Sequence, residues 1–462
     1  MPETSYTRLD NGVRVASEAT AGELATVAVF VDSGSRYESS AINGVSALVK
    51  EAAFLGKEAE IAKLGGSFSA TAGREQTVLK ATVLKADVSK ALEILAGAAK
   101  GTAISEAAVE KAKGAALCAL EGAANSPETA IFDHLHDTAF LDTPLGMSPL
   151  GTPETVSRLR ADDVSAFVRA NFTAPRVVVA AAGAVDHMAV ADAAAKLLGG
   201  LPSVPEGSME ALMEPGIFTG SDIRMRFDSM DSAHIAFGFQ GAAATSPHTL
   251  PLQLLQTIIG AYDERSSLGA NAASVWASEA AKHGLARFAT AFNLSYKDTG
   301  VFGMYSVNPD NKLDDYMWYT LDSLVRLCHE ISDDEVAIAK NQFKTNLLLQ
   351  TAGGEATALD IGKQMLSYGR KVTAAEMFSR IDALTTADLK KTASTFINDQ
   401  DHALAAIGTI HELPDYNWIR RRSYWCVPLF VRRVDWILRL MTYCPSFFAF
   451  GPSRQQFVEN AS

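Results

Sequence analysis

The feature that most restricts the fold of this chain is an internal duplication. Strand-like and helix-like segments recur in the same order after about 200 residues, a period too long for a solenoid repeat. The matched pairs are Ala25–Val31 with Ala233–Gly238, Asn43–Lys57 with Leu250–Ile259, the strands around Arg74 with Arg287–Leu294 and Gly300–Val307, Asp87–Lys100 with Leu313–Ile331, and Ser105–Gly114 with Ser332–Lys344. We therefore predict an α+β fold of two homologous, duplicated domains, each a mostly antiparallel sheet with helices packed on one face.

The clearest linker in the chain is Leu201–Gly207, which contains two prolines and ends in glycine. Such residues favour turns and irregular backbone over helices and strands. The linker predicts one domain at residues 1–207 and its homologue at residues 208–415. Residues 416–462 then form a C-terminal extension of different character.

This extension is rich in arginine and aromatic residues. It holds seven arginines, two acidic residues and no lysine. Within residues 429–443 an apolar helical face is predicted from Phe430, Val434, Ile437, Leu438 and Met441. Three internal arginines disfavour a membrane-spanning helix. Two interpretations remain open: a helix packed on its own protein, or one that docks on a partner subunit or an anionic membrane surface.

The overall composition fits a globular protein with a large core. Hydrophobic residues make up 48% of the chain and charged residues 20%, and the net charge is −12. This negative charge disfavours nucleic acid as a partner. No stretch reaches the roughly 18 consecutive apolar residues that a transmembrane helix needs, so any contact with a membrane is expected to be peripheral.

Several short motifs, collinear over about residues 5–425, carry a resemblance to a known family. They are Asn11–Ala16, Gly34–Glu38, Asn43-Gly44, Arg74–Thr77, Asp133–His136, Thr143–Gly146, Ala182–His187, Phe218–Arg224, Asp298–Gly300, Asp360–Met365, Tyr368–Arg370 and Leu413–Asn417. In these motifs the chain resembles the inverted-motif zinc peptidases, in the branch of mitochondrial processing peptidase β subunits and cytochrome bc1 core 1 subunits. The Arg-rich tail lies outside the pattern.

The resemblance implies a zinc site that can be compared residue by residue. Active members carry His-x-x-Glu-His on the helix that follows Asn43-Gly44, and a glutamate ligand on a later helix. Here the two histidine positions are Ala47 and Glu51, the base position is Lys50, and the later ligand position is Ala119. Alanine offers no donor atom, and Lys50 would repel Zn²⁺. From this degenerate set we predict no catalytic, metal-binding or cofactor-binding residues, no cofactor, and no enzyme activity of the chain itself.

The resemblance also implies partners. The main hypothesis is a structural core subunit of respiratory complex III (ubiquinol–cytochrome c reductase). Such a subunit would pair with a homologous core 2 subunit and contact cytochrome b, cytochrome c1, the Rieske protein and small subunits. It would lie peripherally on the matrix face of the mitochondrial inner membrane, with a membrane-surface contact by residues 429–443. The alternative is a non-catalytic, presequence-binding partner subunit of a mitochondrial processing peptidase, for which an acidic chain suits basic presequences.

Overall fold

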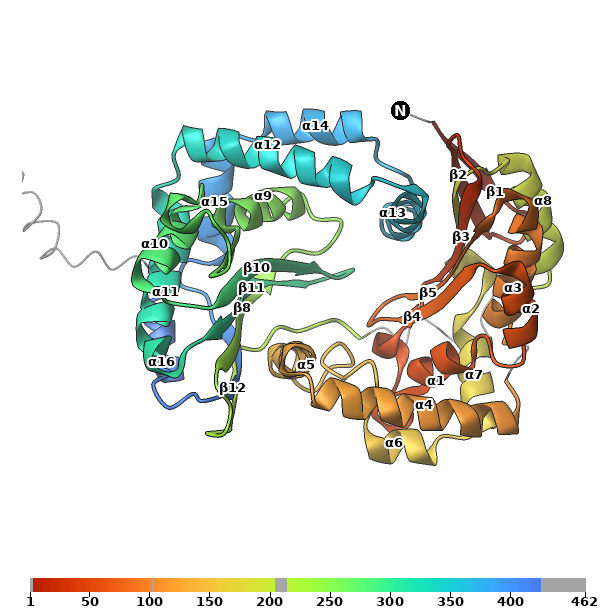
Figure 1. Cartoon of the computed structure of the whole chain (residues 1–462), viewed down its shortest axis with the longest axis horizontal. Helices are drawn as coiled ribbons and strands as arrows, with labels where there is room; N and C mark the ends of the chain where they lie inside the picture. The colour runs from red at the N-terminus through yellow and green to blue at the C-terminus, as the bar shows by residue number, and fades with distance from the viewer. Residues whose placement is uncertain (1–2, 102–103, 204–213, 425–462) are drawn as a thin grey trace, which may run out of the picture. The chain divides into compact units, whose positions relative to one another are not determined.

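The computed structural model describes residues 3–101, 104–203 and 214–424, and shows two six-stranded sheets flanked by helices (Figure 1). We refer to residues 3–203 as the first half and to residues 214–423 as the second half. The predicted boundary at 207/208 falls in the gap between these ranges and stays a prediction. The predicted amphipathic segment 429–443 also lies outside the described residues.

The first sheet has the strand order β1-β2-β6-β3-β5-β4. Its strands are β1 (Thr4–Arg8), β2 (Arg14–Ala19), β3 (Leu24–Val31), β4 (Ser67–Ala72), β5 (Thr77–Leu84) and β6 (Val177–Gly183). All neighbours are antiparallel except β2 and β6. Strands β1 and β2 form a hairpin, in whose turn Gly12 adopts the left-handed φ of 101° that glycine tolerates.

The second sheet has the order β7-β12-β8-β11-β10-β9 and repeats five of these strands. Its strands are β7 (Asp222–Arg226), β8 (Ala233–Gly241), β9 (Ala261–Asp263), β10 (Phe288–Ser295), β11 (Gly300–Asn308) and β12 (His402–Gly408). Strands β7 and β12 are the one parallel pair, at the place that β2 and β6 take in the first sheet. The described strands thus confirm the predicted duplication and the mostly antiparallel sheets.

A layer of helices covers one face of each sheet. In the first half these are α1 (Val45–Ala52), α2 (Glu58–Leu64), α3 (Val88–Ala99), α4 (Glu106–Ala124), α6 (Pro153–Arg158), α7 (Ala161–Asn171) and α8 (His187–Leu198). In the second half they are α9 (Thr249–Ile259), α10 (Val275–His283), α11 (Leu313–His329), α12 (Asp333–Gln350), α14 (Ala374–Ala383), α15 (Thr386–Phe396) and α16 (Tyr416–Arg420). Each layer encloses its own apolar core, as the prediction of helices on one face requires.

The other face of each sheet receives one helix from the opposite half, an exchange that the sequence did not reveal. Helix α13 (Gly354–Ser367) packs on β6, β3 and β2 of the first sheet, and α5 (Pro127–Ala139) packs on β12 and β8 of the second. Small apolar cores result: Ile361 and Met365 lie among first-sheet residues, and Ile131 and Leu135 among second-sheet residues. The two halves therefore share core residues.

No helix in the described ranges has the length and hydropathy that crossing a membrane would require.

Strand β12 opens with a buried histidine whose protonation is expected to affect stability. The His402 side chain is fully buried, stacks on Tyr416 of α16 at 4.2 Å between ring centroids, and has no hydrogen-bond partner for either ring nitrogen among the described residues. Burial lowers the pKa of His402 to about 4 from an ordinary 6.5. Below pH 6.5 the unfolded chain therefore binds more protons than the folded one, so stability falls as pH falls toward 4.

We expect His402→Phe to keep the stacking and to remove this acid sensitivity. Between pH 7 and pH 5 the wild-type protein should lose about 2 kcal/mol more unfolding free energy than the variant. Urea denaturation at both pH values measures the difference. Parallel loss in the two proteins would show that His402 does not titrate in this way.

Candidate functional site: helix α1 and the clasp between the halves

The four positions of the implied zinc site lie on two helices that pack together. Ala47, Lys50 and Glu51 are on α1, Ala119 is on α4, and α1 contacts α4 directly. Ala47 is buried and Ala119 is half-buried. The predicted helix at 43–57 is shorter than expected: α1 ends at Ala52, and turns follow up to Gly56.

The chemistry of these positions does not fit zinc. Zinc in a peptidase takes three protein ligands, and only Glu51 has a donor atom suited to it. Lys50 Nζ lies 2.7 Å from Glu51 Oε1, with both side chains about a quarter exposed (27% and 24%). A partly exposed pair of this kind contributes at most about 1 kcal/mol. In the described residues no three His, Cys, Asp or Glu side chains gather in a way that could hold a metal.

The start of α1 is held by a buried carboxylate. Glu38 accepts hydrogen bonds from the backbone N–H groups of Gly44 and Ser46, both at 2.7 Å, from Ser46 Oγ, and from Asn43 Nδ2 at 3.0 Å. These backbone donors belong to the first turn of α1, where N–H groups lack helical partners and favour negative charge. Burial raises the pKa of Glu38 to about 6, against the lowering effect of these bonds. At pH 7 the group is therefore mostly ionised.

The Asn43-Gly44 motif has a physical reason in this arrangement. Gly44 has a φ of 95°, and a Cβ there would lie 2.9 Å from Val156 Cγ2. Asn43 donates to both Glu38 and the carbonyl oxygen of Ser148. The motif therefore fixes the entry to α1, independently of which residues the helix carries further on.

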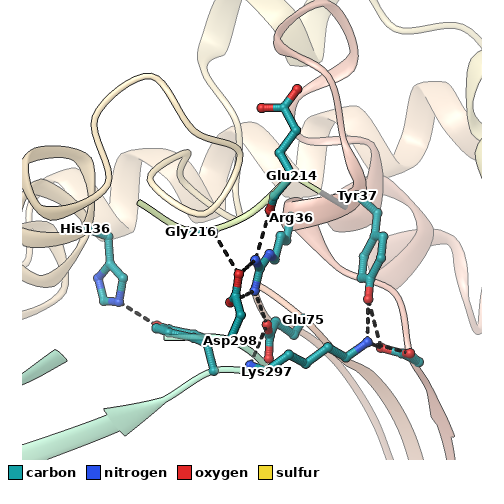
Figure 2. A network of polar contacts seen from close by, with 10 residues as sticks. Arg36, Tyr37, Glu75, His136, Glu214, Gly216, Lys297 and Asp298 are labelled. Carbon is teal, nitrogen blue, oxygen red and sulfur yellow. Dashed lines mark hydrogen bonds and ion pairs between the residues drawn. The ribbon is translucent and has the colours of Figure 1, made fainter. Parts of the chain in front are cut away.

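Next to Glu38 lies a network of charges that joins the two halves, which we call the clasp (Figure 2). Arg36 is fully buried and binds both carboxylate oxygens of Asp298, at 2.7 and 2.6 Å, together with Glu75 Oε1 at 2.6 Å. It also donates to the carbonyl oxygen of Glu214 at 2.9 Å, while Gly216 N donates to Asp298. Burial alone would lower the pKa of Arg36, but its bonds to Asp298 and Glu75 raise it, so the cation persists.

Lys297 makes the second cross-half contact of the clasp. Its Nζ lies 2.6 and 2.7 Å from the two oxygens of Asp32 and 2.6 Å from Tyr37 Oη, and its backbone N–H donates to Glu75. The guanidinium of Arg176 stacks over the Tyr37 ring at 4.3 Å. Two cations thus surround Asp32 and Tyr37, and one of them comes from the other half.

The third contact joins Tyr296 to His136 of α5. His136 Nδ1 lies 2.5 Å from the carbonyl oxygen of Phe132, so this nitrogen carries the proton, and Nε2 accepts from Tyr296 Oη at 2.5 Å. Burial lowers the pKa of His136 to about 3 and raises that of Tyr296 to about 12, so both groups are neutral. His136 is therefore a buried histidine with a hydrogen-bond partner for each ring nitrogen.

All three contacts come from one turn. Tyr296, Lys297 and Asp298 are consecutive residues between β10 and β11, and each binds a different side chain of the first half. Sequence reasoning missed this role, although the motifs Gly34–Glu38, Arg74–Thr77, Asp133–His136 and Asp298–Gly300 contain most of its members. These motifs gave a family resemblance, and the structure shows that they meet at one interface.

The second half has a cavity at the C-terminal end of α9 and the N-terminal part of α12. Helices α9 and α12 are the counterparts of α1 and α4, and a cavity of about 230 Å³ lies between them and the segment 268–274. Its walls are mainly apolar, with Ile258, Leu268 and Ile338, and Glu335 and Gln342 add polar atoms. Glu335 is already bound to Arg326 and to Ser332.

These features define a class of protein: a duplicated α+β chain whose halves each carry a peptidase-type helix pair and are joined by the clasp. Residues 14–153 match the family described as Insulinase (Peptidase family M16), and residues 158–343 match Peptidase M16 inactive domain. The chain belongs to peptidase family M16.

Comparison with known proteins shows which members of this family the chain is similar to. The chain is 41% identical over 431 residues to the mitochondrial-processing peptidase subunit beta of Blastocladiella emersonii, covering 91% of this chain and 92% of that protein. It is 35% identical over 433 residues to cytochrome b-c1 complex subunit 1 of Mus musculus, covering 92% and 90%. A chain of the solved complex III2 from Candida albicans superposes with a TM-score of 0.83 at 28% identity, covering 91% of this chain and all of that one.

These comparisons correct one prediction. We expected the chain not to be an enzyme, but relatives 35–41% identical are named as a processing peptidase subunit, which favours an enzymatic role. The prediction used only four side chains on two helices of one chain. Those four positions decide only whether this one site can bind a metal, and not whether the chain takes part in an enzymatic activity.

Proposed function

We propose that this chain is a β-type subunit of a mitochondrial processing peptidase and that it binds presequences. The observation that carries the proposal is its similarity, over more than nine-tenths of its length, to relatives named as that subunit. The net charge of −12 suits basic presequences as ligands. The proposed domains are residues 1–207 and 208–415, with an extension at 416–462.

The partner that we propose is a homologous second subunit. Because Ala47, Lys50, Glu51 and Ala119 do not make a zinc ligand set, the ligands of a catalytic metal would have to come from outside these four positions. Within this chain, the preserved elements are those that shape the site: the Asn43-Gly44 entry, Glu38 and the contact of α1 with α4.

A second candidate function is a core subunit of respiratory complex III. It is favoured by the similarity to cytochrome b-c1 complex subunit 1 and to a chain of complex III2. In that case the partners would be a core 2 subunit and other subunits of the complex. The chain would then lie peripherally on the matrix side of the inner membrane.

Native isolation of the tagged full-length chain from its own mitochondria tests both candidates. For a processing peptidase subunit we expect a soluble assembly with a homologous subunit that cleaves presequence peptides and contains zinc. Recovery in a particle with cytochrome b and cytochrome c1, without presequence cleavage, would support the complex III role instead. Recovery with neither set of partners would contradict both.

A further inference from the structure

We propose that the β10–β11 turn positions helix α1 through the three consecutive residues Arg36, Tyr37 and Glu38. The stability of the first turn of α1 would then depend on the position of the second half relative to the first. This inference rests on contacts within the chain and not on the proposed function.

The turn binds the first two of these residues. Asp298 holds Arg36 in a bidentate ion pair, and Lys297 binds Tyr37 Oη at 2.6 Å. Two adjacent residues of the second half therefore bind two adjacent residues of the first half. A bidentate pair fixes orientation as well as distance, so a shift of the turn moves the backbone that carries Arg36.

The third residue binds α1. Glu38 follows directly and accepts from the backbone N–H groups of Gly44 and Ser46. The segment between these contacts has little freedom, because Ser35–Tyr37 is a 3-10 turn, Arg36 N donates to Arg74 O at 2.9 Å, and Glu38 N donates to Ser35 O at 3.0 Å. All three side chains are buried. A displacement at Asp298 is thus transmitted to the carboxylate that caps α1.

The main packing partners of α1 reach the second half only indirectly, through helix α5, which contacts α4 and packs on the second sheet. Helices α4 and α7 and strand β4 all belong to the first half. A contact between the halves outside the clasp, the ion pair of Lys80 with Glu355, joins β5 to α13 and does not involve residues 36–38. It provides a matched control, because breaking it weakens the contact between the halves without touching the clasp.

Hydrogen exchange of the full chain, followed by mass spectrometry, tests the proposal with Asp298→Asn and Lys297→Met. In both variants we expect amides in residues 43–52 to exchange about tenfold faster than in the wild type, while helix α8 keeps its protection. In Glu355→Gln the same amides should change less than about twofold. The Lys297→Met variant keeps the test decisive if Asp298→Asn folds poorly, because it leaves Arg36 paired.

Three outcomes would overturn the proposal. One is unchanged exchange in residues 43–52 of both variants while residues 296–298 lose protection. Another is faster exchange of equal size in α1 and α8, which would show general destabilisation without a specific link. The third is an increase of exchange at α1 in Glu355→Gln as large as in the clasp variants.

Discussion

Replacing Arg36 with methionine is expected to lower the free energy of unfolding by about 3–5 kcal/mol. Methionine fills similar space but leaves Glu75 and Asp298 facing one another without the cation between them. Breaking a buried ion pair from one side is costly because the remaining charges cannot recover their hydration. The unfolding free energy of Arg36→Lys should lie between those of the wild type and Arg36→Met. An ammonium keeps the positive charge but cannot make the bidentate pair with Asp298.

Urea denaturation, with tryptophan fluorescence and circular dichroism as probes, measures this effect. The matched control is Arg380→Met, because Arg380 pairs with Glu376 in an exposed position and its loss should cost less than about 1 kcal/mol. Equal unfolding midpoints for the Arg36→Met and Arg380→Met proteins would show that the clasp does not stabilise the fold.

Much of the fold could be predicted because its signals are local. Strand β3 and its counterpart β8 are short apolar runs, and their recurrence after a fixed distance is enough to indicate the duplication from the sequence alone. Helix starts also carry local signals, such as Ser332, which caps α12 and pairs with Glu335 in a capping box.

The exchange of α5 and α13 could not be predicted in this way. An apolar helical face shows that a helix packs on something, but it does not show on which sheet. Arg36 and Asp298 are likewise 262 residues apart. Neither residue has a local pattern that identifies its partner, so a buried arginine and an aspartate in a turn both look like ordinary surface charges in the sequence.

The candidate site, too, could be predicted from the sequence only in part. The sequence placed Ala47, Lys50, Glu51 and Ala119 on helices, and those helices do pack together. The role of Glu38 could not be found, because it depends on a chain reversal between Glu38 and Gly44 that brings a carboxylate to the backbone of α1. The prediction of no enzymatic activity was wrong for a different reason: it rested on four side chains, while relatives 35–41% identical are named as a processing peptidase subunit.

A second large effect is expected from Gly362→Ala on α13. A Cβ at this position would lie 2.0 Å from Phe30 Cε2 and 2.4 Å from Phe30 Cζ, and the Phe30 ring is fully buried in β3. Alanine favours a helix over glycine by about 1 kcal/mol, but a clash of this size in a packed core outweighs that gain. We expect a net loss of about 2–3 kcal/mol in unfolding free energy.

Two further substitutions separate the effect of the clash from the effect of helix propensity. Gly122 lies within α4, and a Cβ there meets nothing within 4 Å, so Gly122→Ala should stabilise the protein by about 0.5–1 kcal/mol. Adding Phe30→Leu to Gly362→Ala should recover part of the loss, because the smaller side chain makes room for the new methyl group. In a double-mutant cycle measured by urea denaturation, neighbours that clash give a coupling energy of about 1 kcal/mol or more. Additive effects of the two substitutions would mean that α13 shifts away from the first sheet, and that the exchanged helix is held less tightly than its contact with Phe30 implies.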